Sequence, residues 1–284
     1  ALCGVVGLRP TPGRVANDAR PLGWSVISVL GPMARDVPDT ALMLQACSGH
    51  DARDPLSVDS ATPCWPLQQV DLRSLRIGFT EDFGVCAVDA SIRRTLRDRV
   101  AALQRMGVQC EPLHLSLDDA DRIFDILRAE SFYAGYAETL ARAPETIAPH
   151  VRANIEMAGA MTLADRAWAH VAQTRLSRQV SKAFEHLDLI LAPTSPVSPF
   201  PWTELYAQQV DGQPMRTYYQ WLALTYVTTL STHPSLALPC GLDEAGMPFG
   251  LQVLGPLHAD ARLLAAAAAL EQAFEADPRL RRPR

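Results

Sequence analysis

The first fifteen residues, ALCGVVGLRPTPGRV, constrain the fold more than any other stretch of the sequence. Residues 3–8 are almost wholly apolar and include two β-branched valines, and the run is too short for a helix. This pattern predicts a short buried strand. Two prolines and a glycine between positions 10 and 13 end the strand and predict a turn. Chain ends normally lie at the surface, so a buried strand at the very start is unusual. We therefore expect a further segment before Ala1.

This opening resembles the end of the amidase signature, the sequence hallmark of a family of serine hydrolases. In that family a Gly-Gly-Ser-x-Arg-x-Pro-Ala run carries the nucleophilic serine. The run continues into Cys-Gly-x-x-Gly-Leu-Lys-Pro-Thr-x-Gly-Arg-Val, which residues 3–15 follow closely. Ala1 matches the alanine that closes the first run. The resemblance implies that the nucleophile lies just upstream of Ala1, with the family's cis-serine and catalytic lysine further upstream. It therefore implies no catalytic residue in this chain.

The resemblance extends along the chain. Residues 31–35 read Gly-Pro-Met-Ala-Arg before a predicted helix, and residues 49–55 match the family's Gly-x-Asp-x-x-Asp-Pro. Residues 246–252 match its Gly-x-Pro-x-Gly-x-Gln signature. We interpret Asp51 and Asp54 in the second motif as turn formers, not as a catalytic carboxylate pair.

Strands and helices alternate through the chain. A predicted strand over 75–79, a helix over 89–106 and a strand over 108–113 have the order of a parallel crossover. The remaining predicted helices span about 37–47, 118–160 with breaks near 144 and 149, 162–186, 218–230 and 259–274, and the remaining strands span 187–194, 231–241 and 246–255. With the resemblance, this pattern predicts an α/β fold with a mixed central sheet flanked by helices, incomplete at its N-terminal side. Residues 1–284 would form a single α/β domain, the C-terminal portion of a larger one.

Composition argues against several classes of function. The net charge of −5 gives no basic face for a nucleic-acid backbone, and no apolar run reaches the length that crosses a bilayer. The six cysteines are scattered without a C-x-x-C, which indicates buried small side chains in a reducing compartment, not a disulfide framework or a metal site. We therefore expect a cytoplasmic protein that binds neither nucleic acid nor a membrane and uses no metal or cofactor.

The chain offers few candidates for chemistry of its own. Lys182 is the only lysine, and we interpret it as a solvated residue that pairs with Glu185 or a neighbouring acid. Ser195 and Ser198 lie in a proline-rich loop with no base nearby in sequence, so neither is favoured as a nucleophile. We expect a structural role for His233, because the proline after it restricts its backbone.

The resemblance assigns the substrate pocket to this chain. Five residues lie on segments that border the substrate site in the family: Thr194, Tyr219, Trp221, Leu222 and Thr225. The alternative is that the aromatic ones are simply core. Family members that use glutamine carry an acidic residue near the position of Leu222, so leucine there argues against glutamine and favours a less polar amide.

Two further features bear on this pocket. Thr229 stands where many members have asparagine, which leaves the pocket's exact chemistry open. Residues 202–216 are predicted to form a loop that could cover the pocket.

Two functions fit the sequence. The chain could be the C-terminal portion of an amidase signature serine hydrolase that cleaves a carbon–nitrogen amide bond of a small-molecule substrate through an acyl-serine intermediate. It would be inactive without the upstream segment, whether linked or supplied by a separate chain. Alternatively, it could be a stand-alone, non-catalytic protein that binds a ligand or a partner. An unpaired strand edge beside residues 3–8 would promote aggregation unless covered, so solubility of the chain alone separates the two.

Overall fold

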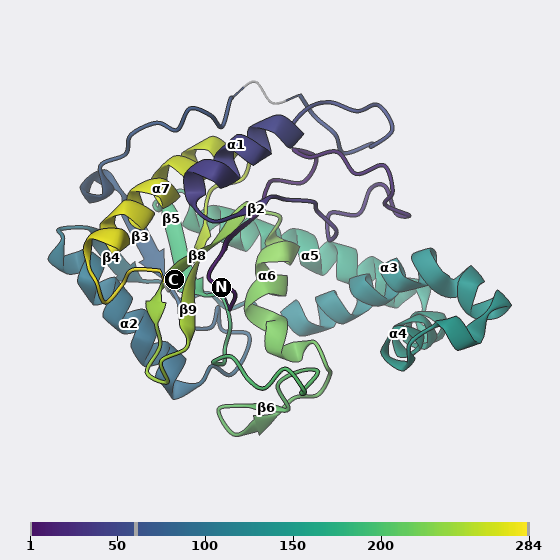
Figure 1. Ribbon diagram of the computed structural model, residues 1–284. Helices are drawn as coiled ribbons and strands as arrows, with labels where there is room; N and C mark the ends of the chain where they lie inside the picture. The colour runs from purple at the N-terminus through teal and green to yellow at the C-terminus, as the bar shows by residue number, and fades with distance from the viewer. Residues whose placement is uncertain (1, 60–61, 283–284) are drawn as a thin grey trace.

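A seven-stranded mixed sheet forms the centre of the computed structural model, which describes residues 2–59 and 62–282 (Figure 1). The strand order is β2-β1-β8-β9-β5-β3-β4. β3 runs parallel to both β4 and β5, and the other neighbours pair antiparallel. The strands are β1 (Val6–Arg9), β2 (Met33–Ala34), β3 (Arg76–Phe79), β4 (Gln109–Pro112), β5 (Leu189–Pro193), β8 (Ser235–Leu242) and β9 (Pro248–Leu254). The predicted α/β fold with a mixed central sheet is confirmed.

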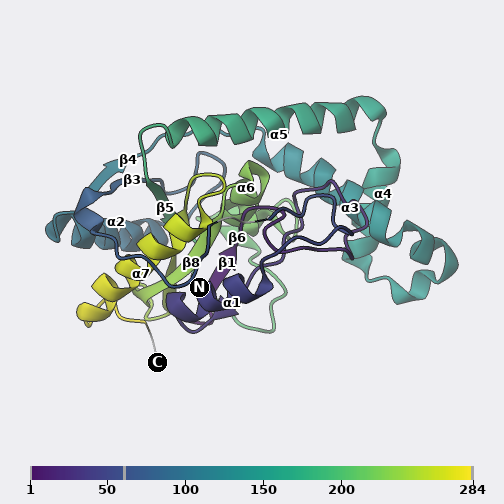
Figure 2. The same ribbon diagram turned by 90° about the horizontal axis from the view of Figure 1, so that it is seen from above.

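Helices flank this sheet. α7 packs against α1 and against β8 and β9, and α2 lies on the same side of the sheet as α7, while α5 runs along the opposite side (Figure 2). The helices are α1 (Val37–Cys47), α2 (Ala90–Arg105), α3 (Ala120–Arg142), α4 (Pro149–Ala160), α5 (Leu163–Ala183), α6 (Ala223–Ser231) and α7 (Asp260–Ala276), with short 3₁₀ turns η1 (Leu72–Ser74), η2 (Pro144–Thr146) and η3 (Gln220–Leu222). The parallel crossover predicted around the second of these helices is present as β3-α2-β4.

Local sequence signals explain where several helices begin. The Asp36 carboxylate accepts the backbone N–H of Asp39 at 2.8 Å and so caps α1. Thr162 and Asp165 form a reciprocal capping box at the start of α5. The expected breaks at Pro144 and Pro149 separate α3 from α4.

The long helices form an arm that extends away from the sheet. α3 packs against α4 and α5, and Figure 2 shows the far ends of these helices projecting beyond the strands. The near half of α3 contacts α6 instead, and buries Ile123, Phe124 and Leu127. α3 therefore connects the arm to the part of the molecule that holds the cavity described below.

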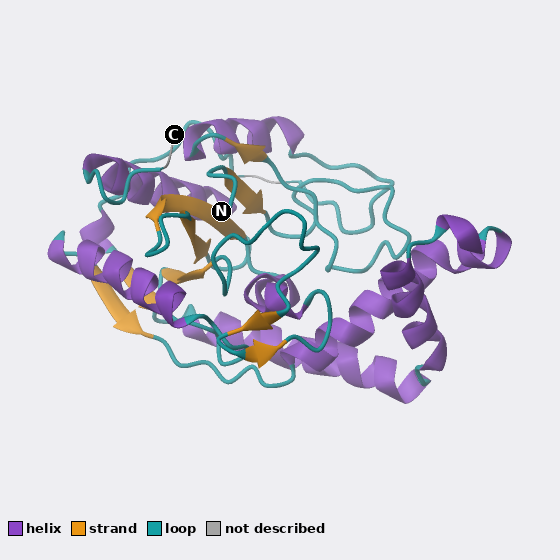
Figure 3. Cartoon of the chain, turned by 60° about the horizontal axis from the view of Figure 1, so that its bottom comes forward, coloured by secondary structure: helices purple, strands orange, loops and turns teal. Residues whose placement is uncertain are grey.

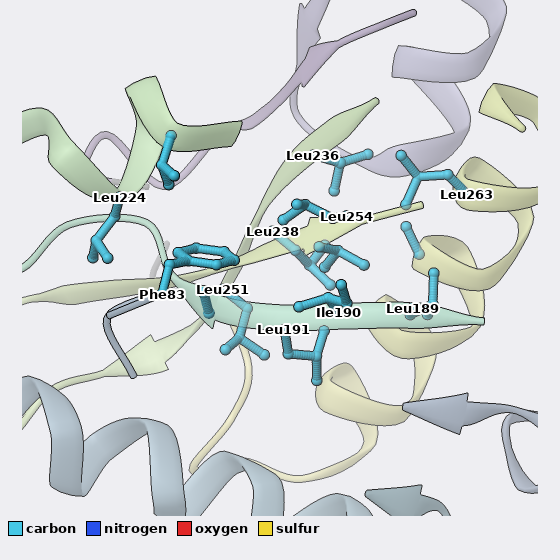
Figure 4. Close-up of a cluster of buried hydrophobic side chains, with 14 of the residues drawn as sticks. Phe83, Leu189, Ile190, Leu191, Leu224, Leu236, Leu238, Leu251, Leu254 and Leu263 are labelled. Atoms are coloured by element: carbon cyan, nitrogen blue, oxygen red, sulfur yellow. The ribbon is translucent and has the colours of Figure 1, made fainter. Parts of the chain in front are cut away.

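Apolar side chains from strands and helices fill the core (Figure 4). Every residue of β5 is buried, as expected for a strand with covered faces. Leu263 of α7 points toward Leu236 and Leu254, while Leu224 of α6 lies near Phe83 on the other side of the cluster (Figure 4). Burying each such side chain stabilises the fold by about 1.5–3 kcal/mol.

The opening strand differs from its predicted place. β1 begins at Val6 instead of residue 3, because Gly4 adopts a left-handed turn with φ 64° and Cys3 is exposed. The expected unpaired edge is also absent from this strand in the described ranges, since β1 pairs with β8 on one side and with β2 on the other. Ala1, which carries part of the resemblance, lies outside the described residues.

Two other expectations need correction. Only Cys64 and Cys240 are buried; Cys86 and Cys110 are half-buried, and Cys3 and Cys47 are exposed. The predicted loop over 202–216 contains a small two-stranded ribbon, β6 (Gln209–Val210) and β7 (Gln213–Pro214), seen beside the loops in Figure 3. Asp211 and Gly212 form its turn, both with positive φ.

The two motif aspartates also differ from each other. Asp51 does form a turn, accepting the backbone N–H of Arg53 at 3.0 Å. Asp54 likewise forms a turn, accepting the backbone N–H of Leu56 at 3.0 Å, but it is buried and forms a 2.8 Å ion pair with Arg20. Burial alone would raise the pKa of Asp54, but the N–H groups of Leu56 and Asn17, together with Arg20, outweigh burial and lower it.

Candidate substrate pocket

A cavity of about 310 Å³ lies where β1, η3, α6, β8 and β9 meet the loop that follows β5. Four of the predicted site residues line it: Thr194, Trp221, Leu222 and Thr225. The rest of the lining is Leu2, Gly7, Arg9, Ser195, Thr228, Thr229, Ser235, Ala237 and Gln252. Segments more than two hundred residues apart in sequence thus meet at one concave site. Whether these residues bind a substrate stays a prediction.

Gln252 fixes the floor of this cavity. Its Nε2 donates to the carbonyl of Leu224 at 2.8 Å, and its Oε1 accepts the hydroxyls of Thr228 at 3.1 Å and Ser235 at 3.2 Å. The side chain is buried, so these bonds replace water contacts that it loses on folding. Gln252 therefore joins β9 to α6 and to β8. The sequence motif contained this glutamine, but the spacing alone did not indicate that it lies at the cavity.

Arg9 is a second cavity residue that the sequence did not indicate. Its guanidinium donates to the carbonyls of Val26 at 3.1 Å and of Thr229 and His233 at 3.3 Å. The Thr229 carbonyl lies in the last turn of α6, where a cation is favoured. Burial lowers the pKa of Arg9 to about 10, against an opposing effect of Asp260. Among the described lining residues, Arg9 carries the only charge.

The hydroxyls of the loop after β5 are engaged locally. Thr194 donates to the carbonyl of Gly250 at 3.0 Å, which holds the loop against β9. Ser195 donates to the carbonyl of Val197 at 2.7 Å, and Ser198 bonds to Asp243. The Ser195 contact forms a tight turn, while the Thr194 and Ser198 contacts hold the loop against distant segments. That neither serine is a nucleophile stays a prediction.

Tyr219 is the one predicted site residue that does not line the cavity as described. It is buried against α3, and its hydroxyl donates to Asp125 at 2.6 Å. Burial raises the pKa of Tyr219 and Asp125 raises it further, so the phenol stays protonated. A direct substrate contact for Tyr219 remains a prediction.

The lysine and histidine candidates lie elsewhere. Lys182 is exposed near the end of α5, and within the described residues it makes no salt bridge, so the expected pair with Glu185 is not formed. His233 is buried, with Nδ1 2.8 Å from the carbonyl of Ser231 and Nε2 3.2 Å from the hydroxyl of Ser181. Burial lowers the pKa of His233 to about 4, so the ring is neutral at pH 7. These contacts favour the structural role expected for His233.

Two other kinds of site find no support in the described residues. Across residues 2–59 and 62–282, no group of three or more His, Cys, Asp and Glu side chains is placed to hold a metal ion. Over the same ranges, none of the helices combines the length and apolar character needed to cross a bilayer.

The fold and the motifs that converge on the cavity define an amidase-type protein. The chain belongs to the Amidase family, whose model matches residues 1–264. It is 30% identical to a subunit of the glutamyl-tRNA(Gln) amidotransferase of Moorella thermoacetica, over 97% of this chain and 60% of the relative. The corresponding subunit of the Picosynechococcus sp. amidotransferase is 29% identical, over 96% of this chain and 61% of the relative.

Solved structures show the same fold. A bacterial aryl acylamidase of the amidase signature family aligns with TM-score 0.86 and 24% identity, over 96% of this chain and 59% of that one. A 6-aminohexanoate cyclic dimer hydrolase in complex with its substrate aligns with TM-score 0.81 and 23% identity, over 96% of this chain and 61% of that one. The chain thus spans about three-fifths of the length of these relatives.

Proposed function

We propose that this chain is the C-terminal portion of an amidase signature serine hydrolase and supplies the wall of its substrate pocket. The nucleophilic serine, the bridging cis-serine and the lysine base would belong to an upstream segment, linked or separate, and the chain alone would be inactive. The substrate would be a small molecule with a carbon–nitrogen amide bond. The assignment of residues 1–284 to a single domain, itself part of a larger one, belongs to the same proposal.

One observation carries this proposal. The cavity is lined both by residues that the amidase resemblance assigns to the substrate site and by Leu2, at the start of the chain. In the family the nucleophile precedes this stretch by only a few residues. A serine placed there would therefore lie close to the cavity mouth. An acyl group held between Trp221 and Thr194 would then present its carbonyl carbon to that serine.

The reaction would be acyl transfer. The serine oxygen would attack the amide carbon while its proton passes through the cis-serine to the neutral lysine. The amine would leave with a proton, and water would then release the acid from the acyl-serine. Backbone N–H groups of the upstream segment would hold the oxyanion. The residues of this chain would bind the acyl part and exclude water.

The lining favours a particular kind of amide. Trp221 and Leu222 give the cavity an apolar side, while hydroxyl groups of Thr225 and Thr228 lie along α6. The described lining contains no carboxylate to pair with an ammonium group, and Arg9 would repel one. This supports an acyl part that is uncharged and largely apolar, in place of glutamine.

A fluorophosphonate, which labels activated serines, tests the proposal. We expect the protein isolated from its own source to react, either as a species well above 31.0 kDa or together with a second chain that carries the label. The recombinant chain of residues 1–284 is the matched control and should not react. An unlabelled species of 31.0 kDa from the source, with no co-purifying partner, would contradict the proposal.

A further inference from the structure

Two carboxylates one helical turn apart on α3 hold the segment that forms the apolar side of the cavity. Asp125 accepts the Tyr219 hydroxyl at 2.6 Å and pairs with Arg216 at 2.9 Å. Asp121 accepts the side-chain amide of Gln220 at 3.1 Å and lies 3.8 Å from Arg216. Each aspartate therefore binds a donor that flanks or belongs to η3, which is Tyr219 for Asp125 and Gln220 for Asp121.

The next helix is tied to the same place. The hydroxyl of Tyr226, on α6, donates to Asp121. Phe124 lies between the two aspartates in sequence, and its ring stacks on Tyr226 with centroids 4.2 Å apart and an interplanar angle of 9°. It also meets the edge of Tyr219 at 5.7 Å. Positions 121, 124 and 125 share one face of α3, so a single helical surface receives both tyrosines.

These contacts are not loose surface pairs. Tyr219 and Tyr226 are each 3% exposed, and both aspartates are half-buried. Burial raises the pKa of each phenol, and the carboxylates raise it further, so both tyrosines are hydrogen-bond donors at neutral pH. Hydrogen bonds to a charged group at such sites are worth more than bonds between neutral groups.

The cavity residues follow directly in the chain. Tyr219 and Gln220 face α3, while Trp221 and Leu222, the next two residues, line the cavity. Trp221 also meets the edge of Phe200 at 5.3 Å, on the loop after β5. A tight 3₁₀ turn has little freedom to move one side without the other. The contacts with α3 therefore fix the position of Trp221 and Leu222, which form the apolar side of the cavity.

We propose that Asp121 and Asp125 are positioning residues that set the shape of the substrate pocket through Tyr219, Gln220 and Tyr226. That the cavity is a substrate pocket rests on the proposed function, but the effect of the two aspartates on the position of Trp221 can be tested without measuring catalysis. Neither aspartate belongs to the described lining, so both act through η3 and α6. Tyr219 would accordingly affect the shape of the pocket without lining it, by holding η3 against α3.

Fluorine NMR of the chain labelled with 5-fluorotryptophan tests the proposal. The chain has five tryptophans, and Trp221→Phe identifies the resonance of Trp221. We expect Asp125→Ala and Tyr219→Phe to shift or broaden the Trp221 resonance while that of Trp168, on α5, stays in place. Asp125→Asn should restore a nearly native resonance, because the amide oxygen still accepts the tyrosine hydroxyl.

Asp119→Asn is the matched control, since Asp119 is the N-cap residue of the same helix and lies 3.8 Å from Arg175. It should leave Trp221 unchanged. An unmoved Trp221 resonance in both Asp125→Ala and Tyr219→Phe would overturn the proposal, as would equal shifts of all tryptophans, which would indicate general loosening. If circular dichroism finds Asp125→Ala unfolded, Tyr219→Phe, which removes one oxygen, decides alone. Fluorophosphonate labelling tests the amidase assignment separately, so the two failures are distinguishable.

Discussion

The side-chain amide of Gln252 on β9 donates a 2.8 Å hydrogen bond to the backbone carbonyl of Leu224 on α6. This bond joins the central sheet to the helix that lines the cavity. The carbonyl oxygen of the same amide accepts two hydroxyls, so both ends of the side-chain amide have partners.

Replacing Gln252 by leucine should destabilise the protein. The change keeps the volume but leaves the Leu224 carbonyl and the Ser235 hydroxyl buried without their partner. We expect the free energy of unfolding to fall by about 2–4 kcal/mol. Urea denaturation followed by circular dichroism measures it, with Gln68→Leu, at an exposed position, as the control. Equal midpoints for the two variants would show that Gln252 does not hold the sheet to α6.

Removing Arg20, the buried partner of Asp54, should lower the free energy of unfolding more than the loss of Gln252 does. Arg20→Leu would leave the Asp54 carboxylate enclosed without its cation, and we expect a loss of about 3–5 kcal/mol. Arg53→Leu removes an exposed arginine that pairs with Asp51 and should change stability by less than about 1 kcal/mol. Thermal unfolding of both variants measures the difference, and comparable melting temperatures would argue against the ion pair.

The Asp54 carboxylate should also make the stability of the protein fall at low pH. Its pKa is lowered in the folded state, so its contribution is present above the ordinary aspartate pKa of about 3.9 and is lost as the pH falls through the folded value. The Asp54→Asn variant should therefore lose less stability between about pH 5 and pH 2 than the native chain. Parallel slopes in urea titrations over this range would contradict the assignment.

His233 should make the free energy of unfolding depend on pH in a higher range than Asp54 does. Its folded pKa of about 4 lies below the ordinary histidine value of 6.5, so the unfolded chain binds the proton first. Stability should be fully present above about pH 6.5 and decline toward pH 4. His233→Gln should flatten this decline, while His50→Gln, at an exposed position, should not. A decline of unchanged size in His233→Gln would place its origin elsewhere.

The character of position 222 should set the kind of amide that binds. Leu222→Asp would add a carboxylate to the lining and should strengthen glutamine binding by about tenfold, the effect of roughly 1.4 kcal/mol from one charge-assisted contact. Leu222→Asn has nearly the same shape without the charge and is the control. Isothermal titration calorimetry measures both, and equal glutamine affinity in the two variants would contradict the role of charge at this position.

Short-range signals predicted most of the fold. The helix predicted over 89–106 is present as α2, which buries Ile92, Leu96, Val100 and Leu103, because helical periodicity is a local property of the chain. The breaks near residues 144 and 149 were predicted for the same reason, because proline interrupts a helix locally. The predicted start of β1 was wrong, since it depends on a glycine in a left-handed turn and on pairing with β2, some twenty-five residues away.

Long-range contacts of the cavity were harder to predict. The resemblance indicated Thr194, Trp221, Leu222 and Thr225, and the structure places them around one cavity. It could not indicate that Tyr219 faces α3, because that orientation depends on Asp125, ninety-four residues earlier. Arg9 and Gln252 were missed because their partners are backbone carbonyls and hydroxyls of distant segments, which leave no pattern in the sequence.

The most direct test of the central claim is NMR mapping of ligand binding on the isotope-labelled chain. Residues 1–284 would be titrated with an uncharged amide that has an apolar acyl part, and with glutamine for comparison. We expect the first ligand to shift signals of residues that line the cavity, among them Thr194, Leu222 and Gln252, and glutamine to shift them less. Shifts that cluster away from the cavity, or a stronger response to glutamine, would contradict the claim.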